Sequence, residues 1–333
     1  MDLTLYRSNT RNQVLNAPVS TSSGYTSAVI NSGNVLNKGI EITIGAKPFK
    51  WWDINVNFAR NMNKILALNA LVSDYYTLSS ARWGNVTIVA KSGEEYGAIM
   101  GRSFLRDDKG KIILDGNRLP QYSARDTHLG NSQYKWIGGI TNRFSCKAIS
   151  LTILLDIKQG GSIYSMTNLL AYSSGLQKGT LEGREGWVRS EQQRIAAGIA
   201  EEDWTPNDGL QLKGVQQNPS GGGGGRPQSK DVTVYVNPQV YWQRVTGNIP
   251  EPFIYDASFI KVRQLNLDYI LPHFNKRIKD ITISLVARNP FILSKHIPNV
   301  DPESSYNNTT GQGLEYGALP THRSYGINLN AKF

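Results

Sequence analysis

Acidic side chains that lie close to tryptophans are the first residues of this sequence that could perform chemistry. The stretches EGREGW and AEEDW place several carboxylates beside Trp187 and Trp204. A pair of carboxylates on either side of a bound sugar can hydrolyse its glycosidic bond. Short runs of charge are more commonly the solvated face of a loop. We therefore interpret both stretches as loop surface and predict that the protein is not an enzyme.

Other residues that could bind a metal or a cofactor are scattered. Four histidines are isolated in the sequence: His128, His273, His296 and His322. None of them has the spacing to a second ligand that a metal site requires. Asp301 and Glu303 lie close together in NVDPESSYNN, but the segment lacks the spacing of a calcium loop. We expect no metal and no cofactor.

Aromatic residues in the long connecting segments are the best candidates for contacting a ligand. Sugar rings stack their C–H faces on flat aromatic surfaces, and Asn and Asp side chains satisfy sugar hydroxyls. The alternative is that each ring packs its own loop, as side chains do in large ordered loops. The candidates are Tyr75, Tyr76, Trp83, Tyr164, Trp187, Trp204 and Trp242.

The overall composition excludes several classes of protein. The 333 residues carry a formal net charge of +10, but Lys and Arg are scattered apart from one run, HFNKRIKD. We therefore expect no nucleic-acid partner. The single cysteine, Cys146, excludes an internal disulfide framework and a cysteine-based zinc site. No apolar stretch reaches the roughly 18 residues of a membrane helix, although a membrane β-barrel hides its apolar face in alternation.

Apolar and polar residues alternate with a period of two in eight segments. These are DLTLYR, GIEITIGA, WWDINVNFAR, WIGGITNRF, ISLTILLD, QLNLDYIL, ITISLVAR and SYGINLNAKF. This period predicts strands with one apolar and one polar face. The apolar parity flips between Val262 and Leu265, which indicates either a β-bulge or a wrong register in the prediction.

Short and long connections alternate strictly between the predicted strands. The short ones lie between 46 and 51, 146 and 149, and 271 and 281, and the long ones cover about 9–33, 62–133, 159–256 and 289–322. In an up-and-down sheet all long loops then lie at one end, which is the pattern of outer-membrane barrels. A soluble β-sandwich explains the alternating strands, but it does not explain the strict alternation of short and long connections.

The barrel interpretation assigns a lipid-facing and a lumen-facing set of residues. Trp51, Trp52, Trp136 and Tyr325 occur at strand ends, where an aromatic girdle would lie. Thr43, Asn57 and Thr152 are predicted to face a watery lumen. The predicted lipid-facing set is Ile42, Ile44, Val56, Phe58, Leu151, Ile153 and Leu285.

The long connections contain signals of further structure. Ser190 and Gln193 form a possible capping box that would start a helix. Asn237, followed by Pro238, is a predicted helix N-cap. The run GGGGG at 221–225 predicts a flexible loop tip, and KIILDG after RDDKG predicts a small hairpin.

Several segments together resemble a known family of membrane proteins. They are, in chain order, NSGNVLNKGIEITI, LGNSQYKWIGGITNRFS, LTILLDIKQGGSIYSMTN, EPFIYDASFIKVRQLNLDYILP and RSYGINLNAKF. This series resembles the carboxy-terminal part of a SusC/RagA-type TonB-dependent outer-membrane transporter. The expected fold class is therefore all-β: an antiparallel transmembrane β-barrel segment of about eight strands from a 22-stranded barrel, with long, partly helical extracellular loops.

The resemblance also implies a function and partners. Residues 1–333 would be the carboxy-terminal portion of the barrel, and we expect the plug and the N-terminal domain to be absent. The family implies nutrient uptake through the Gram-negative cell outer membrane, energised by the TonB system. The cargo would be oligosaccharide or peptide, and a SusD-like lipoprotein would form a lid that docks on the connection 159–256.

The last strand carries one further expectation. In this family the outer-membrane assembly machinery reads a final strand that ends in an aromatic residue, here Phe333. An ordinary edge strand with a chance phenylalanine is the alternative. Two other functions stay open at this point, namely a self-standing small barrel and a soluble glycan-binding β-protein.

Overall fold

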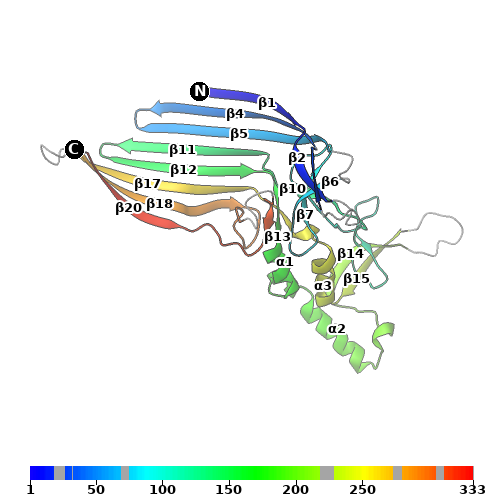
Figure 1. Cartoon of the computed structure of the whole chain (residues 1–333). Helices are drawn as coiled ribbons and strands as arrows, with labels where there is room; N and C mark the ends of the chain where they lie inside the picture. Colours follow the sequence, from blue (N-terminus) through cyan, green and yellow to red (C-terminus); the bar gives the residue numbers. More distant parts are fainter. Residues whose placement is uncertain are drawn as a thin grey trace.

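Eight long strands form one antiparallel sheet in chain order, β1-β4-β5-β11-β12-β17-β18-β20 (Figure 1). The computed structural model describes residues 1–18, 27–31, 33–68, 75–217, 229–272, 280–304 and 311–332. The strand bounds are Asp2–Arg11 (β1), Asn34–Phe49 (β4), Trp52–Ala67 (β5), Trp136–Cys146 (β11), Ile149–Gln159 (β12), Phe259–Pro272 (β17), Asp280–Lys295 (β18) and Ser324–Lys332 (β20). The alternation predicted these same eight strands, although it did not predict the full length of most of them.

The register of the sheet gives its two faces opposite character. Directly opposed residues of an antiparallel pair point to the same face. Ile44 lies opposite Val56, and their neighbours Thr43 and Asn57 also lie opposite each other. A shift of one residue would therefore mix apolar and polar side chains on both faces. The alternation of the sequence fixes the register in this way.

A β-bulge in β17 accounts for the parity flip in the sequence. The pairing of β12 with β17 shifts between Leu154 and Leu155, because Arg263 is an extra residue between Val262 and Gln264. The extra residue reverses the face to which the preceding part of the strand points. The bulge, rather than the wrong-register alternative, is confirmed.

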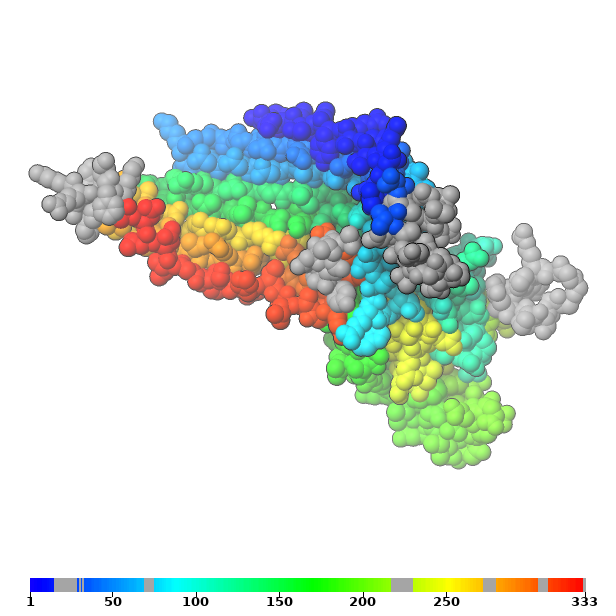
Figure 2. Space-filling model, in the orientation of Figure 1, coloured from blue at the N-terminus to red at the C-terminus, as the bar shows by residue number. Residues whose placement is uncertain are grey.

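The connections between the eight strands differ sharply at the two ends of the sheet. A tight turn at 50–51 joins β4 to β5, and another at 147–148 joins β11 to β12. The connections β1–β4, β5–β11, β12–β17 and β18–β20 all lie at the opposite end, where Figure 1 shows the helices. Figure 2 shows the sheet as adjacent bands from blue to red, with these loops gathered beyond one end.

The long connections build four smaller sheets. Their strand orders are β2-β3, β10-β8-β7-β6, β16-β13-β19 and β15-β14-β9. The bounds are Val14–Pro18 (β2), Ser27–Asn31 (β3), Tyr75–Ser80 (β6), Thr87–Lys91 (β7), Ala98–Gly101 (β8), Ile113–Leu114 (β9), Thr127–Asn131 (β10), Ser162–Ser165 (β13), Leu210–Gln217 (β14), Ser229–Val236 (β15), Ile254–Asp256 (β16) and Leu314–Glu315 (β19). Arg106 bridges Ile112 in the antiparallel sense, which confirms the small hairpin predicted after RDDKG.

The connection between β12 and β17 contains the helices. The α-helices are Met166–Ser173 (α1), Arg184–Ala196 (α2) and Pro238–Asn248 (α3), and the 3-10 helices are Lys178–Leu181 (η2), Glu201–Asp203 (η3) and Glu251–Phe253 (η4). None of the helices among the described residues is long and apolar enough to cross a membrane. The predicted loop tip at 221–225 lies outside the described residues.

One of the two predicted helix starts is confirmed and the other is wrong. The side chain of Asn237 accepts a hydrogen bond from the backbone N–H of Gln239 and caps α3. By contrast, α2 already begins at Arg184, so Ser190 lies inside this helix. The Ser190 hydroxyl instead accepts hydrogen bonds from the indole N–H of Trp204 and from a backbone N–H. The capping pattern was misleading because Ser190 holds the following loop.

The hydrophobic core lies among the loops and not against the large sheet. It brings together residues from distant connections, including Ile88, Ile99, Tyr164, Val245 and Phe253. The eight-stranded sheet buries few of its own apolar side chains. The loops therefore form a folded layer at one end of a wall whose faces stay open.

Candidate functional site

One face of the eight-stranded sheet is a continuous apolar surface. Leu151 lies opposite both Phe144 and Leu267, and Leu267 in turn lies opposite Leu285. Ile327 on β20 extends the row beyond Leu285. The exposed fractions of Leu285 and Ile327 are 50% and 77%. An apolar patch of this extent needs an apolar surrounding.

Aromatic side chains bound this apolar face. At the end with tight turns, Phe49, Trp51, Trp52 and Phe144 stack with ring centroids 5.3–6.3 Å apart. Trp136 contacts Phe58 at 5.6 Å near the end that carries the long loops. Trp136 and Phe144 are eight residues apart on β11, which corresponds to about 26 Å of strand. Because barrel strands are tilted by about 35–45°, this length corresponds to about 20 Å of membrane depth, which is close to the roughly 25 Å apolar band of outer-membrane barrels.

The other face of the sheet is polar. The hydroxyl of Thr43 donates to Asn57 Oδ1 at 3.0 Å. Farther along the sheet, Arg143 donates to Ser150 Oγ, whose hydroxyl donates to Asp268 at 3.3 Å. Hydroxyls, amides and charges of this kind suit a water-filled interior.

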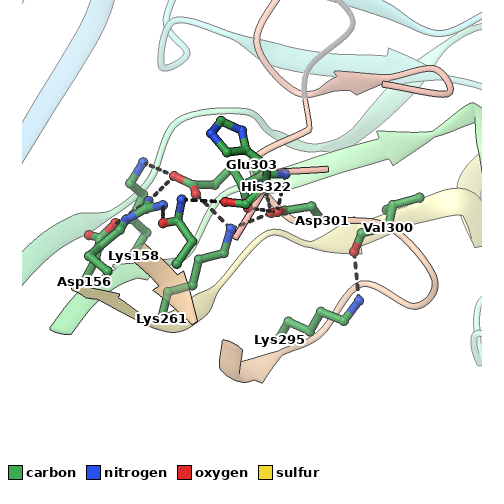
Figure 3. Close-up of polar contacts among 11 residues, drawn as sticks. Asp156, Lys158, Lys261, Lys295, Val300, Asp301, Glu303 and His322 are labelled. Atoms are coloured by element: carbon green, nitrogen blue, oxygen red, sulfur yellow. Dashed lines mark hydrogen bonds and ion pairs between the residues drawn. The ribbon is translucent and has the colours of Figure 1, made fainter. Parts of the chain in front are cut away.

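A cluster of charged side chains lies on the polar face near the long loops (Figure 3). The Lys261 ammonium donates to Asp301 Oδ1 at 2.5 Å and to Glu303 Oε2 at 2.8 Å. Arg263 donates to Asp156 at 2.7 Å and also contacts Glu303. Lys158 completes the cluster at 3.2 Å from Glu303 Oε1. We call these residues the charge cluster; it fastens the loop after β18 to the wall formed by β12 and β17.

The bulge at Arg263 makes the charge cluster possible. Lys261 lies opposite Asp156, so both side chains point to the polar face. In a regular strand Lys261 and Arg263 would share the apolar face with Leu265, and the extra residue turns them to the polar face instead. The side chain of Lys261 is only 1% exposed. An ammonium buried to this extent requires the carboxylates beside it.

The two loop carboxyls of the cluster are held in the charged form. Burial alone would raise the pKa of Glu303, but hydrogen bonds from Arg263 and Lys261 lower it to about 2. Burial likewise opposes ionisation of Asp301, but hydrogen bonds from Lys261 and Thr321 lower its pKa to about 2. Both loop carboxyls are therefore anionic at neutral pH and serve as structural anchors.

A hollow of about 490 Å³ lies beside the charge cluster. Lys158 and Glu303 line it from the cluster, and Tyr134 lines it from the segment before β11. The Ser304 hydroxyl, which also lines it, is buried and has no hydrogen-bond partner among the described residues. The hollow thus exposes polar groups on the same side of the sheet as the polar face.

The seven aromatic candidates fall into different environments. Tyr164 is 0% exposed and donates from its hydroxyl to the Trp83 carbonyl at 2.9 Å, so it packs the core. This burial contradicts a role for Tyr164 in contacting a ligand. Tyr75 packs against a small cluster that contains Val89 and Met100. Tyr76 is half-buried on the same strand, β6.

Trp83 remains open to a ligand. Its side chain is 49% exposed and meets the ring of Tyr316 edge-on at 6.1 Å. The Arg82 guanidinium lies 5.6 Å from the Trp83 ring centroid. A cation over one face of an indole holds the ring in place and leaves other parts of it accessible.

The other three tryptophans line two hollows around α2. Trp242 and Trp187 line one of about 540 Å³, together with Tyr172, whose ring lies 4.4 Å from that of Trp242. Trp187 and Trp204 line a second one of about 420 Å³. Trp187 therefore belongs to both hollows. The structure brings these three tryptophans together in one loop region and leaves Trp83 apart from it.

Sequence reasoning missed the cations of the charge cluster. It weighed Asp301 and Glu303 only as calcium ligands, and the described residues contain no group of side chains arranged to hold a metal ion. The parity flip before Leu265 was the one available signal that Lys261 and Arg263 turn toward the polar face. The assembly signal proposed at Phe333 lies outside the described residues.

An antiparallel wall with one apolar face, one polar face and one-sided long loops defines a class of protein, the transmembrane β-barrel. The described sheet is a segment of such a barrel, and its polar face is the lumenal one. Comparisons with known proteins give the same class.

The chain is similar over its length to TonB-dependent receptors, which confirms the resemblance seen in the sequence. It is 23% identical to TonB-dependent receptor P3 of Formosa agariphila across 98% of this chain. TonB-dependent receptor P26 of the same organism is also 23% identical, across the whole chain. No family model matches.

Solved structures confirm the fold. A chain of the RagAB peptide transporter superposes with a TM-score of 0.62 at 20% identity and covers 98% of this chain. The RagAB peptide importer in its open-open state gives a TM-score of 0.60 at 18% identity. The present chain spans about a third of the length of these proteins and of both receptors, 32% in each case.

Proposed function

We propose that this chain is part of the wall of a TonB-dependent transporter that imports nutrients through the outer membrane of a Gram-negative cell. The observation that carries the proposal is the sheet itself, with an open apolar face bounded by aromatic rings and a polar face that carries the charge cluster. The two named receptors and the RagAB structures support it.

The wall belongs to a larger barrel in this proposal. Strands β1 and β20 lie at the two ends of the sheet order, so the described sheet does not close on itself. Eight strands enclose an interior that side chains fill, whereas transporters with a plugged lumen have many more strands. We propose that residues 1–333 form its carboxy-terminal portion and that Phe333 serves as the assembly signal.

The cargo in this proposal is peptide or oligosaccharide. Peptide is the cargo named for the RagAB relatives, and the tryptophan-lined hollows would also accept sugar rings. Trp83, Trp187, Trp204 and Trp242 are the proposed contacts. Tyr75 and Tyr76 join them from β6, the edge strand of the sheet β10-β8-β7-β6. A SusD-like lipoprotein is the proposed partner at the outer surface, and the TonB system supplies energy through parts of the transporter beyond this chain.

Uptake by the native cell tests the proposal. A strain lacking the gene that encodes this chain should lose uptake of labelled peptides or oligosaccharides, and the gene supplied in trans should restore it. The encoded protein should be recovered with the outer membrane. Recovery in the soluble fraction would refute a membrane role, and unchanged uptake of both cargo classes would refute import.

A further inference from the structure

Basic residues continue the apolar face of the sheet beyond its outer aromatic boundary. Arg7 on β1 lies opposite Lys38 on β4. On β5, Arg60 lies opposite Ile40, and Lys64 lies opposite Leu36. Opposed residues share a face, so all these cations point to the side of Ile40. We call Arg7, Lys38, Arg60 and Lys64 the basic patch.

The basic patch lies at a defined level of the wall. Ile42 and Phe58 oppose each other on the apolar face, and the patch follows them toward the long loops. Phe58 contacts Trp136, which marks the outer girdle. Strands β1, β4 and β5, which carry the patch, lie side by side at one edge of the sheet (Figure 1). The patch is therefore just beyond the apolar band, at the height of lipid headgroups.

The cations of the patch are exposed and lack ion-pair partners among the described residues. Glu95, whose backbone bridges that of Lys64, forms no ion pair with it. The cations of the charge cluster on the polar face are all paired with carboxylates. Like charges held side by side repel one another, so the patch gains from an anionic partner.

We infer that the basic patch binds the phosphorylated headgroup of an outer-leaflet lipid. The apolar residues below it lie against the acyl chains of the same lipid, so one molecule contacts both surfaces. Lysine and arginine bind phosphate through charge-assisted hydrogen bonds, and basic clusters beside a membrane-embedded surface recognise anionic lipids. The inference rests on the proposed outer-membrane location and goes beyond import, because it assigns a lipid site on the outside of the wall.

Lipid A, with and without its phosphates, is the probe for this site. The full-length protein that contains this chain is placed in mixed micelles with each lipid, and binding is measured by thermophoresis. Wild type should bind the phosphorylated form at least tenfold more tightly. The variant Arg7→Gln/Lys38→Gln/Arg60→Gln/Lys64→Gln should lose this preference, because each cation contributes about fivefold near an anionic surface.

Two control variants separate the patch from net charge and from folding. Lys109→Gln/Lys178→Gln/Lys213→Gln/Lys230→Gln removes the same charge from exposed loop positions and should keep the preference. Arg7→Lys/Lys38→Arg/Arg60→Lys/Lys64→Arg exchanges the side chains but retains charge and should also keep it. An equal loss in the loop variant would overturn the inference.

Two further results would overturn it. The first is equal binding of both lipids by membrane-inserted wild-type protein, which leaves the proposed import function intact. The second is displacement of phosphorylated lipid by millimolar inorganic phosphate, which would show a site for free phosphate. Recovery of the protein in the soluble fraction would instead refute the import function, and with it this site.

Discussion

The face to which a side chain points decides what each position of the wall tolerates. Val56 lies opposite Ile44 on the apolar face, and the next residue, Asn57, lies opposite Thr43 on the polar face. The two positions lie on the same strand at nearly the same depth in the membrane. They differ in that Val56 faces lipid and Asn57 faces water. They form a matched pair for testing the lipid-facing assignment.

Val56→Arg should destabilise the assembled barrel by about 2–4 kcal/mol, the cost of an arginine at the lipid midplane. Asn57→Arg should cost far less, because its guanidinium would stay in water. Unfolding by urea in lipid vesicles measures both. Equal tolerance at the two positions would show that this sheet does not lie in lipid.

Acid should weaken the attachment of the loop after β18 to the wall. Asp301 and Glu303 have pKa values lowered to about 2 in the fold, against about 4 in an unfolded chain. A carboxyl with a lowered pKa contributes stability that is fully present above the unfolded value and is lost as the pH falls through the folded one. Stability should therefore be constant above about pH 5 and fall between about pH 4 and pH 2.

The variant Asp301→Asn/Glu303→Gln provides the reference for this titration. It lacks both loop carboxylates, so its stability should be lower at neutral pH and should change less between pH 4 and pH 2. Urea unfolding of wild type and variant across this range makes the comparison. Parallel curves would assign the acid dependence to other carboxyls.

At the scale of elements, the bulge in β17 lets Lys261 and Leu265 face opposite sides of the sheet although they are four positions apart. Deleting Arg263 would leave Val262 two positions from Leu265, so the strand would become regular and Lys261 would stay on the polar face. The deletion would remove the contacts of Arg263 with Asp156 and Glu303, and we expect the barrel to assemble but to unfold at a lower urea concentration than wild type. Arg263→Ala loses the same contacts but keeps the extra residue, so equal unfolding midpoints of the two variants would show that the bulge itself adds no stability.

The strands and the faces of their side chains could be predicted from the sequence, whereas the loop interactions could not. A period of two depends only on neighbouring residues, so it located β4, β5 and β12 and assigned Val56 and Asn57 to opposite faces. The charge cluster joins Lys261 to Asp301, which is 40 residues away. Nothing in the local pattern distinguishes this pair from any other. The helix start predicted at Ser190 was wrong for a similar reason, because the partner of Ser190, Trp204, lies beyond the helix.

At the scale of the whole molecule, the loops form a separate layer whose parts differ in how firmly they are held. Helix α3 contributes Val245 to the loop core, so removing it would disturb the layer. Helix α2 contributes no residue to that core and projects from it (Figure 1). Within the connection 159–256, we therefore propose that the lipoprotein lid docks on the part around α2.

The segment that contains α2 can be deleted and its two ends joined by a linker. A Cβ on Gly183 would lie 2.3 Å from the backbone N of Leu210, so the two ends of the segment 184–209 are adjacent. A short Gly/Ser linker in place of 184–209 would remove α2, Trp187 and Trp204 but leave α1, α3 and β14. We expect the full-length protein to stay inserted and heat-resistant, because the deleted segment is not part of the core.

This deletion should abolish co-purification of the lipoprotein and reduce cargo uptake. Large aromatic side chains such as Trp187 and Trp204 are the usual anchors of a protein interface, and both would be lost. Shortening the glycine run at 221–225 is the matched control, since it shortens the same connection without removing an aromatic residue. If the lipoprotein still binds the deletion variant with unchanged affinity while uptake falls, then the segment around α2 contacts cargo instead.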